Sequence, residues 1–185
     1  MDYYHLVTRI PMEKGQIIDF ENGNTNRLYD FWMKREARTE DGKDIFDVLT
    51  ANKLQEEIGI AYDYVFNQAR AVRETIMELV RVQLYPERPS RFSCLYVSES
   101  LENIGKWKEN FESYNREVLQ LVKLRSNIEA FTGDASLLPE INGDSFDKKI
   151  QQAKRYWSGE RHGELEETLL GGRIEVVEIV KEYSK

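Results

Sequence analysis

A glutamate set between two leucines is the strongest candidate for chemistry in this sequence. In the run "ELEETLL", strand-like alternation places Glu167 on the same face as Leu165 and Leu169. A carboxylate with apolar neighbours on its own face is poorly placed for solvation, which makes Glu167 the candidate for a functional acid. The alternative is an edge strand of slipping register in which Glu164, Glu166 and Glu167 are all solvated.

Histidine and cysteine offer fewer possibilities. The chain has two histidines and one cysteine, without "HExxH" or paired "CxxC", so no metal site is predicted. His5, in "YYHLVTR", is either functional or a partly buried structural imidazole. A nucleophilic pair of Cys94 with His5 or His162 is disfavoured, because Cys94 lies among apolar residues typical of a buried thiol. The phosphate-binding patterns "GxxxxGK[ST]" and "GxGxxG" are also absent.

Length and composition indicate a single domain spanning residues 1–185, with 41% hydrophobic residues available for one core. Charged residues make up 32% and the net charge is -7, which disfavours bulk binding to nucleic acid or an anionic membrane. The lone Cys94 cannot form an internal disulfide. With no signal-peptide pattern and no run of about 18 apolar residues, we expect a cytoplasmic protein without a transmembrane helix. Composition leaves the oligomeric state open.

The N-terminal half must position His5. Alternation predicts a strand from Tyr3 that ends at Pro11, with His5 facing away from Leu6 and Ile10. Residues 12–45 are rich in Gly, Asn and charge, which predicts a loop with one short helix. Residues 46–85 have helical apolar spacing, interrupted near Gly59. Pro86 and Pro89 end that helix.

The second half must position the remaining candidates. "RFSCLYVSES" predicts a strand with Tyr96 and Ser98 on one face, preceded by Ser90 and Arg91, which are either functional or hold the turn. "SLENIGKWKENF" predicts a helix capped by Ser98 or Ser100. We expect a strand in "REVLQLVKLRS", turns in "FTGDASLLPEINGD" and a helix in "SFDKKIQQAKRYW".

The two glycines that follow "ELEETLL" predict a tight turn. "RIEVVEIVKEY" also reads as a strand, so Gly171 and Gly172 would close a β-hairpin between the two runs. Strands at both ends of the chain with helices between them indicate an α+β fold.

Three separated runs resemble the ADP-ribosyltransferase superfamily. Many members begin with a strand carrying "YH" followed closely by threonine, as in "YYHLVTR". They continue with an aromatic residue before small hydroxyl residues, as in "CLYVSES", and end with a glutamate followed by aliphatic residues, as in "EETLLGG". The run "RETIMELVRVQLYPERPSRFSCLYVSES" is also similar to an uncharacterised bacterial family associated with that superfamily.

This resemblance implies a single α+β domain with a curved or split mixed β-sheet around a cleft and a helical insertion at about 46–85 after the first strand. It implies NAD as a substrate. His5 and Thr8 would bind the cofactor, with His5 on the adenosine ribose. Tyr96 would stack on the nicotinamide, and Ser98 would contact its amide or shape the pocket. Glu167 would hold the ribose hydroxyl beside the scissile bond and stabilise an oxocarbenium-like centre.

Two departures keep alternatives open. Leu6, Val7 and Thr8 follow His5 where poly-ADP-ribosyl enzymes have Gly-Thr. "ELE" resembles the paired-glutamate signature of arginine-modifying members, so Glu164 or Glu166 could replace Glu167 as the acid. The function implied is ADP-ribosyl transfer to an unknown acceptor, or NAD glycohydrolysis. The alternative is a non-catalytic binding or structural module of the same fold.

Overall fold

The computed structural model describes residues 2–34, 36–50, 58–162 and 165–183. Within these residues the fold is a single α+β domain with two antiparallel sheets and five α-helices. The predicted fold class is therefore confirmed, but every strand pair is antiparallel, so the prediction of a mixed sheet is wrong.

The larger sheet has four strands and contains both ends of the described chain. Its order is β1-β4-β7-β2. Its strands are β1 Tyr3–Val7, β4 Gln120–Ser126, β7 Arg173–Glu182 and β2 Ile17–Asp19. The strand β1 ends earlier than predicted, and the short β2 lies in a segment predicted as loop.

The smaller sheet has three strands in the order β3-β6-β5. Its strands are β3 Leu95–Val97, β6 Glu166–Leu170 and β5 Phe131–Asp134. A single bridge between Tyr4 and Ser98 links β1 to β3 across the two sheets. The strand β5 falls in a segment predicted as turns, where its short length gave no alternation to detect.

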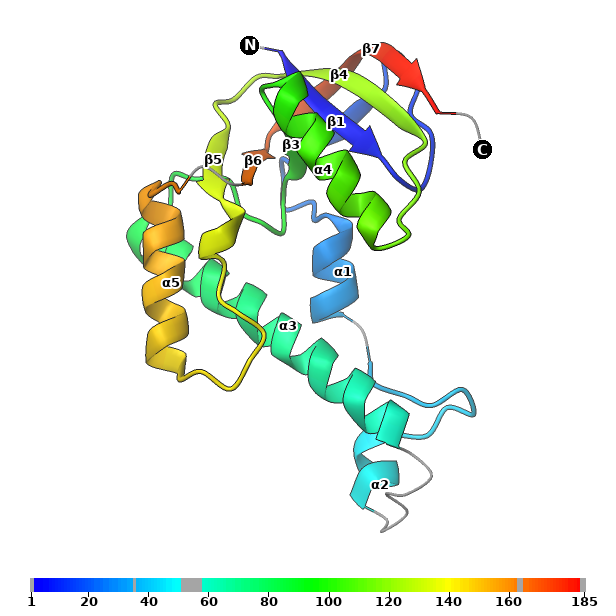
Figure 1. Cartoon of the computed structure of the whole chain (residues 1–185), viewed down its shortest axis with the longest axis vertical. Coiled ribbons are helices and arrows are strands. Elements are labelled where there is room, and N and C mark those ends of the chain that lie inside the picture. Colours follow the sequence, from blue (N-terminus) through cyan, green and yellow to red (C-terminus); the bar gives the residue numbers. More distant parts are fainter. Residues whose placement is uncertain (1, 35, 51–57, 163–164, 184–185) are drawn as a thin grey trace.

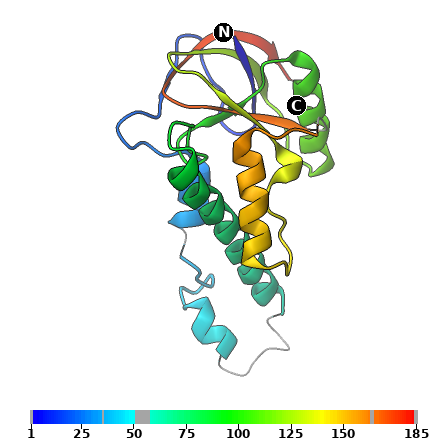
Figure 2. The ribbon, with the colours of Figure 1, turned by 90° about the vertical axis from the view of Figure 1, so that its left-hand side faces the viewer.

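The helices lie mostly on one side of the smaller sheet (Figure 1). They are α1 Arg27–Met33, α2 Ile45–Thr50, α3 Ile58–Leu84, α4 Leu101–Ser113 and α5 Phe146–Ser158, with a 3-10 turn η1 at Ala135–Leu137. In Figures 1 and 2, α3 and α5 pack side by side, while α2 and the start of α3 extend away from the sheets. No helix of the described residues is long and apolar enough to cross a membrane.

Local sequence signals explain where the helices begin and end. Ser100 caps α4 by accepting a hydrogen bond from the Asn103 amide, as one of the two predicted caps. Ser145 caps α5 in the same way, and α5 ends at Gly159 with φ of 82°. The helical region predicted at 46–85 contains α2 and α3, and residues 51–57 lie outside the described part. It follows β1, β2 and the short helix α1, which is the one short helix predicted within residues 12–45.

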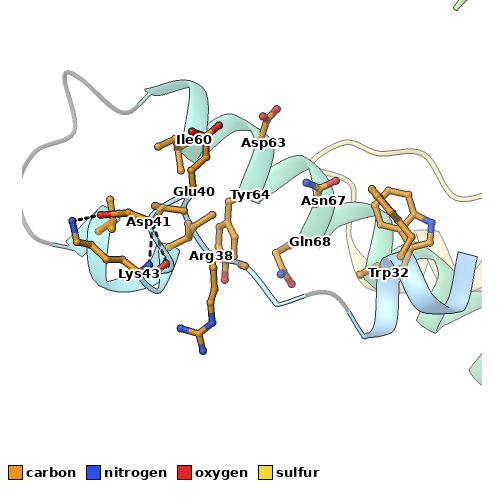
Figure 3. Close-up of a pocket in the computed structure, with 16 residues that line it drawn as sticks. Trp32, Arg38, Glu40, Asp41, Lys43, Ile60, Asp63, Tyr64, Asn67 and Gln68 are labelled. Carbon is orange, nitrogen blue, oxygen red and sulfur yellow. Dashed lines mark hydrogen bonds and ion pairs between the residues drawn. The ribbon is translucent and has the colours of Figure 1, made fainter. Parts of the chain in front are cut away.

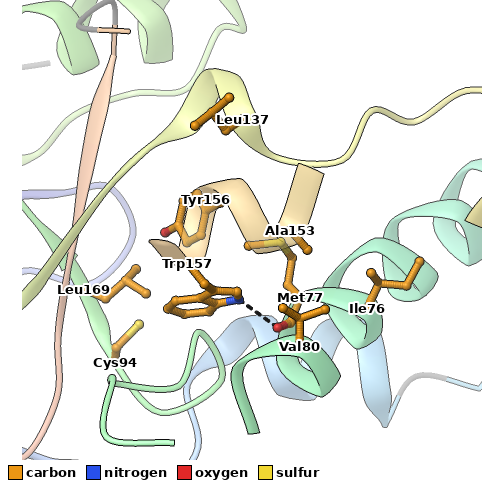
Figure 4. Packing of buried hydrophobic residues seen from close by; sticks show 9 residues of the cluster. All are labelled: Ile76, Met77, Val80, Cys94, Leu137, Ala153, Tyr156, Trp157 and Leu169. Atoms are coloured by element: carbon orange, nitrogen blue, oxygen red, sulfur yellow. Dashed lines mark hydrogen bonds between the residues drawn. The ribbon is translucent and has the colours of Figure 1, made fainter. Parts of the chain in front are cut away.

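Two apolar layers hold these elements together. Between the two sheets lie buried aliphatic side chains, among them Val97, Val122, Leu124, Leu170 and Val176. Between the smaller sheet and the helices α3 and α5 lie Met77, Val80, Ala153, Tyr156, Trp157 and Leu169 (Figure 4). The Trp157 indole donates a hydrogen bond to the Met77 carbonyl at 2.8 Å, which ties α5 to α3.

The predicted hairpin at Gly171 and Gly172 is wrong. The strands on either side of these glycines belong to different sheets, since β6 pairs with β3 and β5 while β7 pairs with β4 and β2. Gly172 has φ of 67°, and a Cβ there would lie 2.6 Å from Asn127 Oδ1. The glycine pair therefore carries the chain from one sheet to the other at a crowded crossing, where residues with side chains would collide.

Candidate functional site

The two sheets separate directly after the bridge that links β1 to β3. The backbone amides of Tyr4 and Ser98 each donate to the other residue's carbonyl at 2.8 Å. One residue further along β1, the contact with β3 is made by a side chain instead of the backbone: His5 Nδ1 lies 2.7 Å from the Tyr96 carbonyl oxygen. His5 thus spans the point at which the strands split.

Burial determines the charge of the histidine, and the contact with Tyr96 determines which ring nitrogen carries the proton. Burial, with a smaller contribution from the positive charge of Arg116, lowers the pKa of His5 to about 4 against the opposing effect of the Tyr96 hydrogen bond. His5 is therefore neutral at pH 7. Because a carbonyl oxygen only accepts, Nδ1 must carry the proton and donate it, which leaves Nε2 as a hydrogen-bond acceptor.

Glu167 lies on β6, on the face covered by α5, and only 5% of it is exposed. Its Oε1 accepts hydrogen bonds from Arg91 Nη1 and from the Tyr156 hydroxyl, the latter at 2.7 Å. No residue in the described part of the chain donates to its Oε2. The two oxygens of the carboxylate therefore differ: within the described residues, only Oε1 is held by donors, and it has two of them.

Arg91 is the centre of a buried ionic network. Its Nε donates to Glu74 Oε2 at 2.9 Å, and its Nη1 also lies 3.2 Å from the Tyr156 hydroxyl. Burial alone would disfavour the charge, but the carboxylates of Glu167 and Glu74 raise the pKa of Arg91 well above its usual value. Arg73 completes the network by binding Glu74 Oε1 at 2.8 Å. Removing one partner of such a buried pair typically costs about 3–5 kcal/mol.

Tyr96 joins this network from β3. It pairs with Leu169 across the sheet, which puts its side chain on the same face as Glu167. Its ring centroid lies 5.4 Å from the Arg91 guanidinium carbon, and its hydroxyl donates to the Arg91 carbonyl oxygen at 3.4 Å. Arg91 therefore contacts both Tyr96 and Glu167, although the two lie on different strands.

The other two predicted contacts lie apart from this network. Thr8 follows the end of β1, and its hydroxyl accepts hydrogen bonds from Arg116 at 2.8 and 3.1 Å. Ser98 is buried, donates to the Ser100 carbonyl at 3.1 Å and accepts from the Asn103 side-chain amide at 3.1 Å. These bonds fix the start of α4.

The remaining sequence interpretations can be placed in the same way. The alternative of a fully solvated strand is wrong for Glu167, which is buried. Glu166 is half-buried and pairs with Arg161 at 3.0 Å, whereas Glu164 lies outside the described residues. The expectation of a buried Cys94 is confirmed, and burial raises the pKa of its thiol. Across residues 2–34, 36–50, 58–162 and 165–183, no three or more His, Cys, Asp or Glu side chains gather to hold a metal ion.

Sequence reasoning missed most of the network that holds Glu167. Arg91 was noted only as a functional or turn-holding residue. Each of two other members had a detectable signal. Glu74 is a charged residue between the apolar residues Val72 and Ile76, and Tyr156 carries a hydroxyl on a helix rich in aromatic residues. A buried charge within an apolar stripe requires a partner, but the stripe does not identify it.

A separate hollow of about 760 Å³ lies beside α2 and the start of α3, away from the sheets (Figures 1 and 3). It is bordered by Trp32 of α1, residues 37–43, α2 and the first half of α3. Its cations have acidic neighbours, since Arg38 pairs with Glu36 at 2.8 Å and Lys43 with Asp41 at 2.5 Å. No lining residue comes from β1, β3 or β6, so this hollow is distinct from the Glu167 site.

Comparison with protein families identifies the family of this chain. Residues 3–182 match the family described as "Protein of unknown function (DUF2441)". The chain belongs to the DUF2441 family. The match spans the strands that carry His5, Tyr96 and Glu167 together with the Arg91 network, so the whole candidate site lies inside the DUF2441 region. No curated protein matches the chain.

Proposed function

We propose that this DUF2441 protein binds NAD at the split between β1 and β3 and cleaves its nicotinamide–ribose bond, transferring ADP-ribose to an acceptor or to water. The observation that carries this proposal is the order of the strands. His5, Tyr96 and Glu167 lie on β1, β3 and β6, which are joined one to the next by the Tyr4–Ser98 bridge and the β3–β6 ladder. These are the three positions on which the resemblance to ADP-ribosyltransferases rests, and they lie on neighbouring strands.

The groups present have the chemistry that this reaction needs. The glycosidic bond from ribose C1′ to the nicotinamide nitrogen breaks, and nicotinamide leaves with the electron pair. The resulting oxocarbenium-like centre is stabilised by a carboxylate, and Glu167 Oε2 would accept a hydrogen bond from a ribose hydroxyl, since the two side-chain donors lie on Oε1. A hydroxyl or another nucleophile then bonds to C1′ and releases its proton to solvent.

His5 and Tyr96 would hold the rest of the substrate. The neutral His5 presents Nε2 as an acceptor, which suits a second ribose hydroxyl. The half-buried Tyr96 ring offers an aromatic surface for the nicotinamide. Thr8 would also bind the cofactor, and Ser98 would contact the nicotinamide amide or shape the pocket, as the resemblance implies.

A second candidate is a non-catalytic module of the same fold. The observation that favours it is the burial of Glu167, whose charge is already balanced by Arg91 inside the protein. A carboxylate held in this way also serves as a purely structural partner that joins β6 to α3 and α5. The two candidates differ in whether the protein turns over NAD.

The test is nicotinamide release from labelled NAD, with and without cell extract, by the full chain and its variants. Glu167→Gln should lower the rate by about 10²–10³ while leaving NAD binding nearly intact, because the amide keeps the shape but loses the charge. His5→Ala and Tyr96→Ala should instead weaken NAD binding, measured by calorimetry. Glu166→Gln, on the neighbouring residue that pairs with Arg161, is the matched control. Wild-type protein that neither binds nor cleaves NAD at millimolar concentration would refute the enzyme proposal.

A further inference from the structure

The buried Arg91 side chain contacts both Glu167 and Tyr96, the two proposed substrate-contacting residues on the face of the smaller sheet that α5 covers. Arg91 precedes β3 and is 3% exposed. Its Nη1 binds Glu167 Oε1, while its guanidinium carbon lies 5.4 Å from the centroid of the Tyr96 ring. The Tyr96 hydroxyl donates a hydrogen bond to the Arg91 carbonyl oxygen. Any movement of Arg91 would therefore change the placement of both groups.

We propose that Arg91 is a positioning residue for NAD cleavage, fixing Glu167 by Oε1 so that Oε2 faces the ribose, with the Tyr156 hydroxyl as its partner. This inference rests on the proposed function. A carboxylate can rotate about its last bond, and a single donor would leave that rotation free. Two donors on Oε1, Arg91 Nη1 and the Tyr156 hydroxyl, determine which oxygen is presented.

The shape of the arginine side chain matters to this role. Its planar fork lets Nε bind Glu74 on α3 while Nη1 binds Glu167 on β6, so the two carboxylates are held a fixed distance apart. Lysine would keep the charge but could not hold both acids in one plane. Tyr156 is fixed in turn by close packing against Gly133, where a Cβ would lie 2.6 Å from the ring.

The alternative role for Arg91 is inhibitory. Its guanidinium is a planar cation beside Tyr96 and Glu167, where the cationic nicotinamide ring would also bind. If Arg91 occupied the substrate's place, shortening or removing it would increase NAD cleavage. Positioning predicts the opposite change, so one set of variants distinguishes the two roles.

The experiment measures kcat and KM for nicotinamide release by Arg91→Lys, Arg91→Met and Tyr156→Phe. We expect Arg91→Lys to lower kcat by about 10², because small misplacements of a reacting group cost that much, and Arg91→Met to be less active than Arg91→Lys. Tyr156→Phe keeps the ring and should lower kcat about tenfold, as expected for one lost hydrogen bond. KM should change less than kcat in each case.

The controls are Arg125→Lys on an exposed part of β4 and Tyr114→Phe, whose side chain is 77% exposed. Each rate is normalised to folded protein from a thermal melt, because Arg91→Met leaves two buried carboxylates without their main partner. If the wild-type protein is active and folded Arg91→Lys and Tyr156→Phe have an unchanged or increased kcat, the positioning role of Arg91 is refuted while the proposed function stands. A wild-type protein without NAD binding or cleavage would refute the proposed function and this inference together.

Discussion

Gly133 is the position at which the structure makes its sharpest prediction about stability. It lies on β5 opposite Glu167, and a Cβ built there would be 2.6 Å from Tyr156 Cε2 and 2.7 Å from Cζ. Carbon atoms in contact normally lie about 3.5–4.0 Å apart, so the overlap is about 1 Å. The Tyr156 ring is fully buried and packs on Trp157 and Phe131, with centroids 5.0 and 5.6 Å away. It has no room to move aside.

We therefore expect Gly133→Ala to lower the free energy of unfolding by about 2–3 kcal/mol, the upper part of the range for overpacked cores. For a domain of this size the melting temperature should fall by roughly 4–12 °C. Urea unfolding at pH 7 measures the first quantity and calorimetry the second. Gly143→Ala is the control, because nothing lies within 4 Å of its added Cβ.

A double-mutant cycle identifies the cause. If the cost comes from the Tyr156 ring, then adding Gly133→Ala to a Tyr156→Ala protein should be neutral or stabilise it by about 0.5 kcal/mol, as alanine usually does relative to glycine in a strand. A cost of 2 kcal/mol in both backgrounds would mean that the backbone of β5 needs glycine for another reason. A Gly133→Ala protein as stable as wild type would refute the packing described here.

Two further predictions concern His5 and Gly172. Burial lowers the pKa of His5 to about 4, so below about pH 6.5 the unfolded chain binds a proton that the folded chain does not bind. The free energy of unfolding should therefore fall by about 2 kcal/mol from pH 7.5 to pH 5 in the wild-type protein, and by less in His5→Gln. Urea unfolding midpoints at each pH measure this difference. An equal fall in both proteins would contradict a neutral His5 with a lowered pKa. Gly172→Ala combines φ of 67° with a Cβ 2.6 Å from Asn127, and should cost about 2 kcal/mol in urea unfolding; Gly15→Ala, with φ of 86° in open space, should cost about half as much. Equal costs at the two glycines would exclude a steric contribution from Asn127.

Local sequence pattern by itself determined several features of this protein. Alternation in "ELEETLL" places Glu167 on the same face as Leu169, and burial of that face follows from its apolar neighbours. A serine cap for α4, at Ser98 or Ser100, and the helical spacing before Pro86 were equally readable. Each of these signals comes from residues within a few positions of one another, because caps and periodicity depend on local backbone geometry.

The pairing of strands was decided by the tertiary structure. Two glycines between strand-like runs favour a hairpin locally, yet β6 pairs with β3 and β5 while β7 pairs with β4 and β2. Each strand buries apolar side chains in its own sheet, with Leu169 in the cluster beside the helices and Val176 in the cluster between the sheets. A turn signal specifies that the chain bends, but the partners available across the whole fold decide which strands pair.

The partners of Glu167 were also decided by tertiary structure. Arg91 and Tyr156 are 76 and 11 positions away along the chain, and Glu74 is a further 17 positions before Arg91. Nothing in the sequence connects these residues, since a buried carboxylate requires a cation and donors without specifying where they come from. The packing of α3 and α5 against the smaller sheet supplies them, because only in the folded protein do β6, the turn before β3 and the two helices share one water-poor space.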